Sequence, residues 1–282
     1  MFTYSSEWAI PQSYDQSLTP STLQVRKQSQ KGVTDVKPII VDDVTFFVKK
    51  GGHGVEAFVY NSDNFTYDSE NVSIFSTDLI EDPVSGCALD SSTNDDAHWL
   101  ILVNSDGSLA IYQTLREQEV SAWSLATSQT IDDENVVYQS YFKQAVTVDN
   151  TVYFVVERTI DGATVRYLEK HSFDVYTDCT IRSTYGTPTD TITGLNKLNN
   201  MTVGFVGDSY AFSNKVVTSN QIVLVPEFPD EDVTISSADV GCLFTPLVET
   251  NPIVPLFDFG SSAPIPKRIP RVFVYYYQPQ GS

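Results

Sequence analysis

The feature that most constrains the fold of this chain is a repeated layout of an apolar run, a turn that carries glycine, and a second apolar run. It occurs in "VDDVTFFVKKGGHGVEAFVYN" (Val41–Asn61), "AHWLILVNSDGSLAIYQT" (Ala97–Thr114) and "VDNTVYFVVERTIDGATVRYLEK" (Val148–Lys170). Aligning Gly54, Gly107 and Gly162 gives spacings of 53 residues (107 − 54) and 55 residues (162 − 107). Short runs rich in Val, Ile, Phe and Tyr between turn residues are typical of strands. Their recurrence predicts stacked antiparallel hairpins.

The composition of these hairpins indicates strands that are covered on both faces. The runs Val44–Val48 and Val152–Val156 contain few polar positions, as expected for strands packed between neighbouring sheets. Asp106 and Asp161 each precede a glycine that can supply the positive φ of a turn, so we expect both aspartates to be turn residues. Propeller blades repeat at roughly 40–50 residues. The sequence therefore predicts an all-β fold, with a partial or complete β-propeller over residues 33–180.

Two tryptophan-containing segments resemble each other, namely "SSEWAI" (Ser5–Ile10) and "VSAWSL" (Val120–Leu125). If the second is an outer strand of a blade, the first is the outer strand of a blade whose inner strands are not in this sequence. Residues 1–32 are therefore expected to form an outer strand and a linker. The locally basic stretch Leu18–Val33 fits two readings: it covers a blade edge or reaches a neighbouring subunit, or it is an ordinary connection.

The repeat stops near Thr180, and helix signals are nearly absent throughout. Residues 181–282 are expected to form a small β-barrel or sandwich with a proline-rich C-terminal arm that begins near Thr250. The strands expected in this part are Met201–Val206, Tyr210–Phe212, Gln221–Val225, Val233–Ile235 and Arg271–Tyr277.

The charge of the chain limits the partners it can have. It carries 17 Lys and Arg against 36 Asp and Glu, a formal net charge of −19. A surface this acidic repels phosphate, so tight non-specific binding of nucleic acid is not expected, although DNA could slide past such a wall. No apolar run approaches the roughly 20 residues needed to cross a bilayer, so we expect no membrane span.

The sequence gives no basis for a metal site or a disulfide framework. Cys87, Cys179 and Cys242 are widely separated, odd in number and form no CxxC motif, which indicates folding in a reducing compartment. The acidic segments Asn94–His98 and Asp132–Asn135 do not match the spaced calcium loop and are expected to be solvated.

Candidate catalytic groups are numerous but form no motif. Nothing selects a glycosidase-type carboxylate pair from the 36 acids, and the Asp-box spacing of sialidases is absent. His53, His98 and His171 belong to no nucleophile–base motif, and there is no Gly-x-Ser-x-Gly elbow. Gly51–Gly54 opens no helix that could cradle phosphate. We therefore assign no catalytic, cofactor-binding or metal-binding residue.

The charged stretch "YQTLREQEVSAW" (Tyr112–Trp123) is read as a structural corner between two strands. In that reading Val120 and Trp123 pack, while Arg116, Glu117 and Glu119 point outward or pair locally. Exposed ion pairs of this kind contribute only about 0–1 kcal/mol.

Several stretches, taken in order, resemble one family. They are "SSEWAI…LTPSTLQVRKQSQKGV", "VDDVTFFVKKGGHGVEAFVY", "REQEVSAW", "TVRYLEK", "VGCLFTPLVETNPIVP" and "PKRIPRVFVYYY". Together they resemble the nozzle family of short-tailed bacteriophages, also called tail tubular protein B, with the P22-like packaged-DNA-stabilisation proteins as distant kin. The resemblance covers most of the chain.

The resemblance implies a β-propeller attached to a β-rich platform, assembled as a hexameric ring around the DNA exit channel at the virion tail. It implies contacts with other copies of the chain and with tail adaptor and fibre proteins, assembly in the host bacterial cytoplasm, and no catalytic residues. Family members are usually longer, so the sequence is expected to be an excised part of one. We expect a non-enzymatic structural protein past which DNA moves during ejection.

A second class of function remains open, a propeller-based binding module for host-surface glycan or another tail protein. The loops to watch in that case are "GGHG" (Gly51–Gly54) and the aromatic-rich Tyr60–Phe75. An enzyme is the third alternative.

Overall fold

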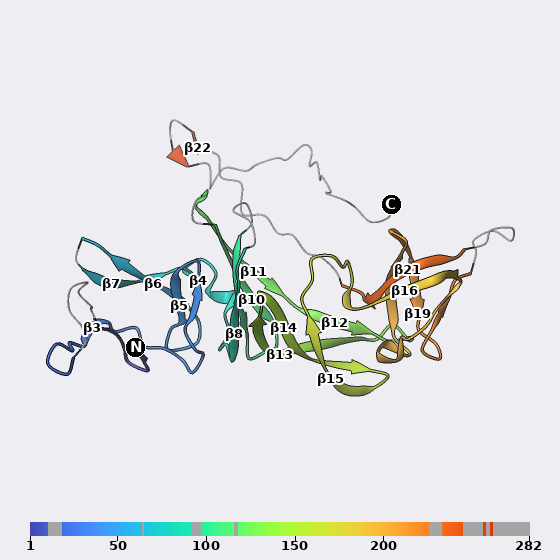
Figure 1. The fold of residues 1–282 in the computed structure, drawn as a ribbon, viewed down its shortest axis with the longest axis horizontal. Coiled ribbons are helices and arrows are strands. Elements are labelled where there is room, and N and C mark those ends of the chain that lie inside the picture. Colours follow the sequence, from blue (N-terminus) through green and yellow to red (C-terminus); the bar gives the residue numbers. More distant parts are fainter. Residues whose placement is uncertain are drawn as a thin grey trace.

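The computed structural model describes residues 1–10, 19–63, 65–91, 97–115, 118–225, 233–244, 256–257 and 260–261. These residues form strands and connections (Figure 1), with no α-helix among them, and the short 3-10 turns include η1 (Thr77–Leu79) and η3 (Asn196–Leu198). The predicted all-β class is confirmed.

Most of the chain before residue 171 forms sheets of antiparallel strands that are consecutive in sequence. The N-terminal sheet contains β1 (Phe2–Thr3), β2 (Ser6–Ala9) and β3 (Arg26–Ser29). The first sheet contains β4 (Ile39–Val41), β5 (Val44–Val48), β6 (Val55–Asn61) and β7 (Thr66–Asn71). The second sheet contains β8 (Ser85–Leu89), β9 (His98–Val103), β10 (Leu109–Leu115) and β11 (Val120–Ala126). The third sheet contains β12 (Ser128–Ile131), β13 (Val137–Val148), β14 (Thr151–Ile160) and β15 (Ala163–Lys170).

The first, second and third sheets pack face to face in chain order. Strand β9 shows how, because its alternate side chains enter two different cores. Leu100 and Leu102 pack with residues of the first sheet such as Phe46. Ile101 packs with residues of the third sheet such as Phe154. Strand β9 thus has two covered apolar faces. The prediction of two covered faces is confirmed for Val44–Val48, where Phe47 is buried and contacts Phe2, but it is only partly right for Val152–Val156, where Tyr153 and Val155 are half-buried. Figure 1 shows the sheets following one another along the long axis.

One part of the predicted repeat is wrong. The turns at Gly54 and Gly107 join the second and third strands of their sheets, whereas Gly162 joins β14 to β15, the third and fourth strands of the third sheet. The equivalent turn of the third sheet is at Asp149 and Asn150, with φ values of 49° and 53°. Asp and Asn tolerate the left-handed conformation without glycine. Aligning glycines therefore selected the wrong hairpin, and the last spacing of 55 residues does not relate equivalent turns.

The N-terminal sheet covers the outer face of the first sheet. The Phe2 ring lies 5.2 Å from the rings of both Phe47 and Phe58. The strand predicted at Ser5–Ile10 is present as β2. Within the basic stretch, β3 lies along β7, where the Tyr67 backbone N–H donates to Oε1 of Gln28 (2.7 Å). Of the two readings of this stretch, the contacts favour the one in which it covers a sheet edge.

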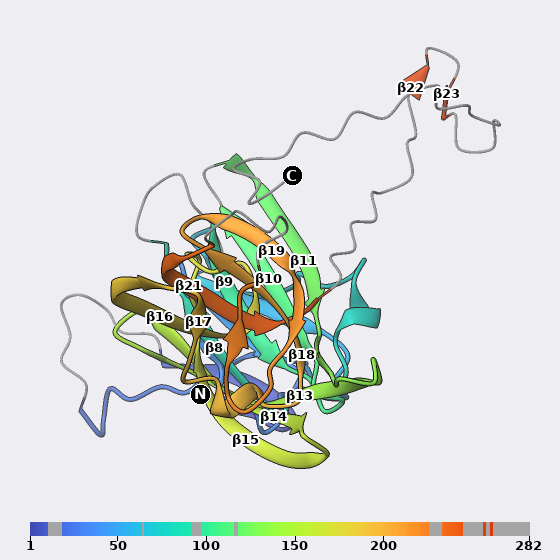
Figure 2. The ribbon, with the colours of Figure 1, turned by 90° about the vertical axis from the view of Figure 1, so that its right-hand side faces the viewer.

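The fourth sheet follows β15 and has non-consecutive strand order β16-β21-β18-β19. Its strands are β16 (Asp178–Thr189), β18 (Thr202–Gly207), β19 (Tyr210–Val216) and β21 (Ile235–Cys242), with β17 (Thr191–Ile192) and β20 (Ile222–Val223) as a separate pair. In Figure 2 this sheet lies in front of the second and third sheets. A further short pair, β22 (Leu256–Phe257) and β23 (Gly260–Ser261), lies near the C-terminus.

The strand predictions after residue 180 were partly right. All four short strands between Met201 and Ile235 have counterparts in β18 to β21, although β21 extends to Cys242. Strand β16 was not predicted, because "DCTIRSTYGTPT" lacks an apolar run, and it crosses the expected boundary at residue 180. The strand predicted at Arg271–Tyr277 lies outside the described residues, as does most of the proline-rich arm.

Candidate functional site

The charged corner of Tyr112–Trp123 lies between β10 and β11. The Trp123 indole packs as predicted: its Nε1 donates to the backbone oxygen of Val72 (2.9 Å) and its ring lies 5.0 Å from that of Tyr112. The prediction that Val120 packs is wrong, because β11 is an edge strand and this side chain is exposed. Glu119 is exposed as predicted. Two residues of the corner lie outside the described part of the chain, Arg116 and Glu117.

The three histidines occupy separate environments. Nδ1 of His53 lies 3.1 Å from a backbone carbonyl oxygen, and Nδ1 of His98 lies 3.3 Å from the Asp90 carboxylate. The His171 ring packs edge-on against Trp99, with centroids 5.7 Å apart, and burial lowers the pKa of this imidazole. The contacts of the three rings are thus with backbone groups, a carboxylate and an aromatic ring, and they do not form a nucleophile–base pair.

The two turn aspartates act as predicted. The Asp106 carboxylate accepts a hydrogen bond from the Ser108 backbone N–H (2.8 Å) in the turn between β9 and β10. Asp161 has a φ of 50° and accepts a hydrogen bond from Nδ2 of Asn200 (2.9 Å). Both aspartates are therefore turn residues, but only the Asp106 carboxylate bonds within its own turn, whereas that of Asp161 binds the distant Asn200 side chain.

The calcium alternative gains no support from geometry. Oδ1 of Asp132 accepts backbone N–H bonds from Glu134 (3.0 Å) and Val136 (2.8 Å), so this loop is an Asx-type turn. Within the described ranges, no three His, Cys, Asp or Glu side chains come together as a cation site requires. Most of the other acidic segment, Asn94–His98, lies outside those ranges.

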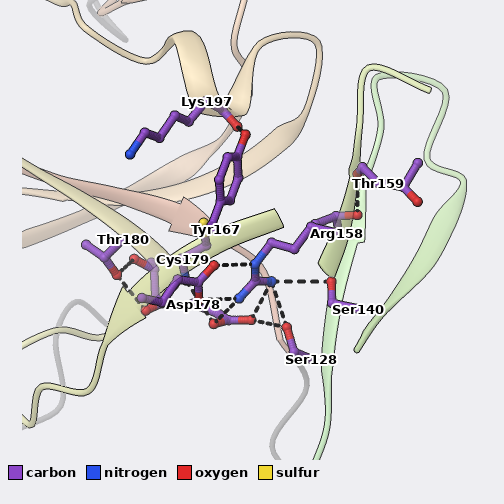
Figure 3. Close-up of polar contacts among 12 residues, drawn as sticks. Ser128, Ser140, Arg158, Thr159, Tyr167, Asp178, Cys179, Thr180 and Lys197 are labelled. Atoms are coloured by element: carbon purple, nitrogen blue, oxygen red, sulfur yellow. Dashed lines mark hydrogen bonds and ion pairs between the residues drawn. The ribbon is translucent and has the colours of Figure 1, made fainter. Parts of the chain in front are cut away.

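The largest cluster of side-chain hydrogen bonds and ion pairs in the described residues surrounds Arg158, where the third and fourth sheets meet (Figure 3). Its side chain has no solvent exposure. Nε and Nη2 donate to the two carboxylate oxygens of Glu169, both at 2.7 Å, and Nη2 and Nη1 donate to those of Asp178 at 3.0 and 3.1 Å. Nη1 also donates to the hydroxyls of Ser128 (2.7 Å) and Ser140 (3.3 Å). Each guanidinium nitrogen thus has a partner.

The cluster joins strands that are distant in the sequence. Arg158 is on β14, Glu169 on β15 and Asp178 on β16, while the serines are on β12 and β13. Burial alone would lower the pKa of the guanidinium, but the hydrogen bonds with Glu169 and the charge of Asp178 raise this pKa above its usual range. The arginine therefore stays charged at every pH at which the protein is folded.

This arrangement is suited to holding two sheets together rather than to catalysis. A general acid and a nucleophile of the glycosidase type need two carboxylates that face a substrate with different protonation states. Here both carboxylates clamp the same cation in bidentate pairs, the geometry in which arginine–carboxylate recognition is strongest. Asp178 also accepts a hydrogen bond from Ser128, which adds to the clamp.

Sequence reasoning missed this cluster, although one signal was present. The inward positions of β14 alternate as Val152, Phe154, Val156, Arg158 and Ile160, and all five are buried. A cation in phase with four apolar residues must be paired, because an isolated buried charge is very costly. The partners could not be found in the same way, since Asp178 belongs to the unpredicted strand β16.

A second surface lies at β6 and β7, within the predicted loop Tyr60–Phe75. A hollow of about 260 Å³ is lined by Val59, Tyr60, Asn61, Ser62, Asp68 and Glu70. The rings of Tyr60 and Tyr67 lie 5.2 Å apart, and Tyr60 and Phe65 are both exposed. The other predicted loop, Gly51–Gly54, is a tight turn whose Gly52 approaches Asp82.

No family model matches this sequence, and a search of curated proteins finds no match. No helix in the described residues is both long enough and apolar enough to span a membrane.

Proposed function

We propose that this protein is a non-enzymatic structural component of a bacteriophage tail, part of a nozzle or tail-tube ring around the DNA exit channel. The observation that carries the proposal is the stack of three four-stranded antiparallel sheets with a hydrophobic core between each neighbouring pair. Propellers are built from four-stranded sheets of this kind packed face to face. The same arrangement is expected from the resemblance to the nozzle family.

We propose further that the three sheets are blades of a partial propeller, followed by the small β domain. The inward face of the third sheet packs on the second, through residues such as Phe154 and Val156. Its other face keeps Val146, Val148 and Leu168 exposed. An exposed apolar face at the end of a stack is what remains when the next blade of a propeller is absent.

The mechanism in this proposal is mechanical and electrostatic. Rigid all-β subunits form a closed ring with other copies of the chain and attach to tail adaptor and fibre proteins. The net charge of −19 keeps the ring from holding DNA, because like charges repel. The ring is assembled in the host bacterial cytoplasm and ends in the virion tail.

Two measurements test this function. Gold-labelled antibodies raised against the chain should mark one end of virions made by the phage that carries the gene. A gel-shift assay at moderate salt should show no retention of double-stranded DNA. Unlabelled virions would refute the tail assignment, and micromolar binding of DNA would refute the channel wall.

The second candidate is a binding module for host-surface glycan, and the exposed aromatic side chains at β6 and β7 favour it. Sugars stack on such rings, and Asp68 and Glu70 line the adjacent hollow and could accept hydroxyl hydrogen bonds. A glycan array separates the two functions. A strong signal that is lost in Tyr60→Ala would move the protein from tail wall to receptor binder.

A further inference from the structure

The fourth sheet brings together two cysteines that lie 63 residues apart in the sequence (242 − 179). Cys179 is near the start of β16 and Cys242 is the last residue of β21. Cys242 is 1% exposed in the core of the fourth sheet, and Cys179 packs against the same core. Cys242 is directly opposite Asp178, the residue before Cys179, and both cysteines are free.

A β-bulge lies at this point of the strand pair. Asp178 is opposite Cys242 and Ile181 is opposite Val240, so two residues of β16 face the single residue Gly241. A bulge of this type redirects a side chain relative to the regular alternation of a strand. A Cβ at Gly241 would lie 2.4 Å from the Asp178 backbone oxygen, which means that the bulge occupies space that only glycine leaves open.

The bulge is what brings Cys179 to Cys242. Directly opposed residues share a face, so in a regular ladder Asp178 would be on the side of Cys242 and Cys179 on the other. Cys179 instead has a φ of 51°, in the left-handed region that glycine usually occupies in bulges. Its side chain consequently packs against the core that contains Cys242.

The neighbouring contacts hold Cys179 in this unfavourable conformation. The Asp178 carboxylate accepts the Cys179 backbone N–H (2.8 Å) while Arg158 clamps the same carboxylate. Strained residues persist only where the surroundings determine them, and they occur often at functional positions. Cys179 therefore differs from Cys87 in two respects: it has a strained backbone and it has a second cysteine nearby. Cys87 belongs to the core between the second and third sheets, which contains neither of the other cysteines.

We propose that Cys179 and Cys242 form a disulfide when the folded protein meets a two-electron thiol oxidant, and that this bond locks β16 to β21. Each sulfur loses its proton and one electron, and one S–S bond forms. With diamide as the oxidant, one thiol adds across the N=N bond to give an S–N adduct. The second sulfur then attacks the first, so that the S–S bond forms, the S–N bond breaks, and the reduced diamide leaves as a hydrazine with both protons. The proposal is independent of the proposed function.

The environment also sets the rate of this reaction. The attacking species is the thiolate. The hydrogen bond with Cys242, burial, and the negative charge of Glu169 raise the pKa of the Cys179 thiol, and Arg158 only partly opposes them. The pair therefore oxidises slowly near neutral pH, with a rate that rises up to about tenfold per pH unit.

The test treats the native full chain with diamide and maps the thiols by mass spectrometry. Trypsin cleavage after Lys and Arg places the three cysteines in separate peptides, residues 51–116, 171–182 and 216–267. We expect an intact mass lower by about 2 Da and a linked 171–182/216–267 pair that dithiothreitol separates. The oxidised protein should melt at least about 5 °C above the reduced one, because the bond closes a long loop of the unfolded chain.

Matched variants assign the bond. Cys179→Ser and Cys242→Ser should each abolish the mass loss, and Cys87→Ser should leave it unchanged. If a serine variant does not fold, the peptide map of the wild-type protein still shows whether residues 171–182 and 216–267 are linked. The proposal is overturned if residues 171–182 and 216–267 remain fully alkylatable after diamide treatment of the native protein, or if Cys87 is linked as readily as the other two.

Discussion

The buried arginine offers the sharpest test of how the third and fourth sheets are held together. Arg158→Met keeps an unbranched side chain of similar length but removes the cation, leaving the Glu169 and Asp178 carboxylates unpaired. Breaking a buried ion pair in this way costs about 3–5 kcal/mol. These carboxylates are 18% and 26% exposed, so water partly solvates the charges that remain. We therefore expect a loss near the lower end, about 3 kcal/mol.

The assay is thermal unfolding followed by circular dichroism, with Arg166→Met as the matched control. Arg166 is on the neighbouring strand β15 and pairs with Glu157 (2.9 Å), but its side chain is 69% exposed. The control should cost about 0–1 kcal/mol. At roughly 2–4 °C per kcal/mol, Arg158→Met should lower Tm by about 6–12 °C. Equal shifts in the two variants would refute the claim that the buried clamp holds the sheets together.

Two further predictions concern the first sheet and the interface between the second and third. The Glu56 side chain is 1% exposed, neither carboxylate oxygen has a hydrogen-bond partner, and burial raises its pKa although Lys31 and Lys49 oppose this. The raised folded-state pKa of Glu56 stabilises the protein at low pH, and this stabilisation is lost as the pH rises from the ordinary carboxyl pKa through the folded-state pKa. Glu56→Gln cannot ionise, so its stability relative to wild type should increase over that rise in pH; a difference in urea unfolding that does not change with pH contradicts this. At Gly107 (φ 85°) an added Cβ would lie within 3.0 Å of Tyr141, whereas at Gly162 (φ 70°) it would meet nothing within 4 Å. Gly162→Ala should cost about 1 kcal/mol and Gly107→Ala about 1–3 kcal/mol more, and equal urea midpoints would show that the interface yields to the methyl group.

The sequence located most strands correctly, but it did not show which strands occupy the same position in successive sheets. Alternating apolar residues and Asp-Gly turns are local signals, and they correctly located β5, β6, β9, β10, β14 and β15. The choice of equivalent turns failed at the third sheet, because Asp149 and Asn150 make the required left-handed turn without glycine. Strand β16 was missed, since its "DCTIRSTYGTPT" sequence becomes a strand through pairing with β21 rather than through its own apolar pattern.

The same distinction between local signals and distant contacts applies to the candidate sites. The sequence by itself determined that the chain is all-β, that Asp106 and Asp161 lie in turns, and that Trp123 packs at a corner, because each of these follows from neighbouring residues in the chain. Only the tertiary structure decided that Arg158 meets Asp178, that Val120 stays exposed, and that a bulge turns Cys179 toward Cys242. Such contacts join residues 20 to 63 positions apart (178 − 158 and 242 − 179), and no local pattern encodes which strands will pair across that distance.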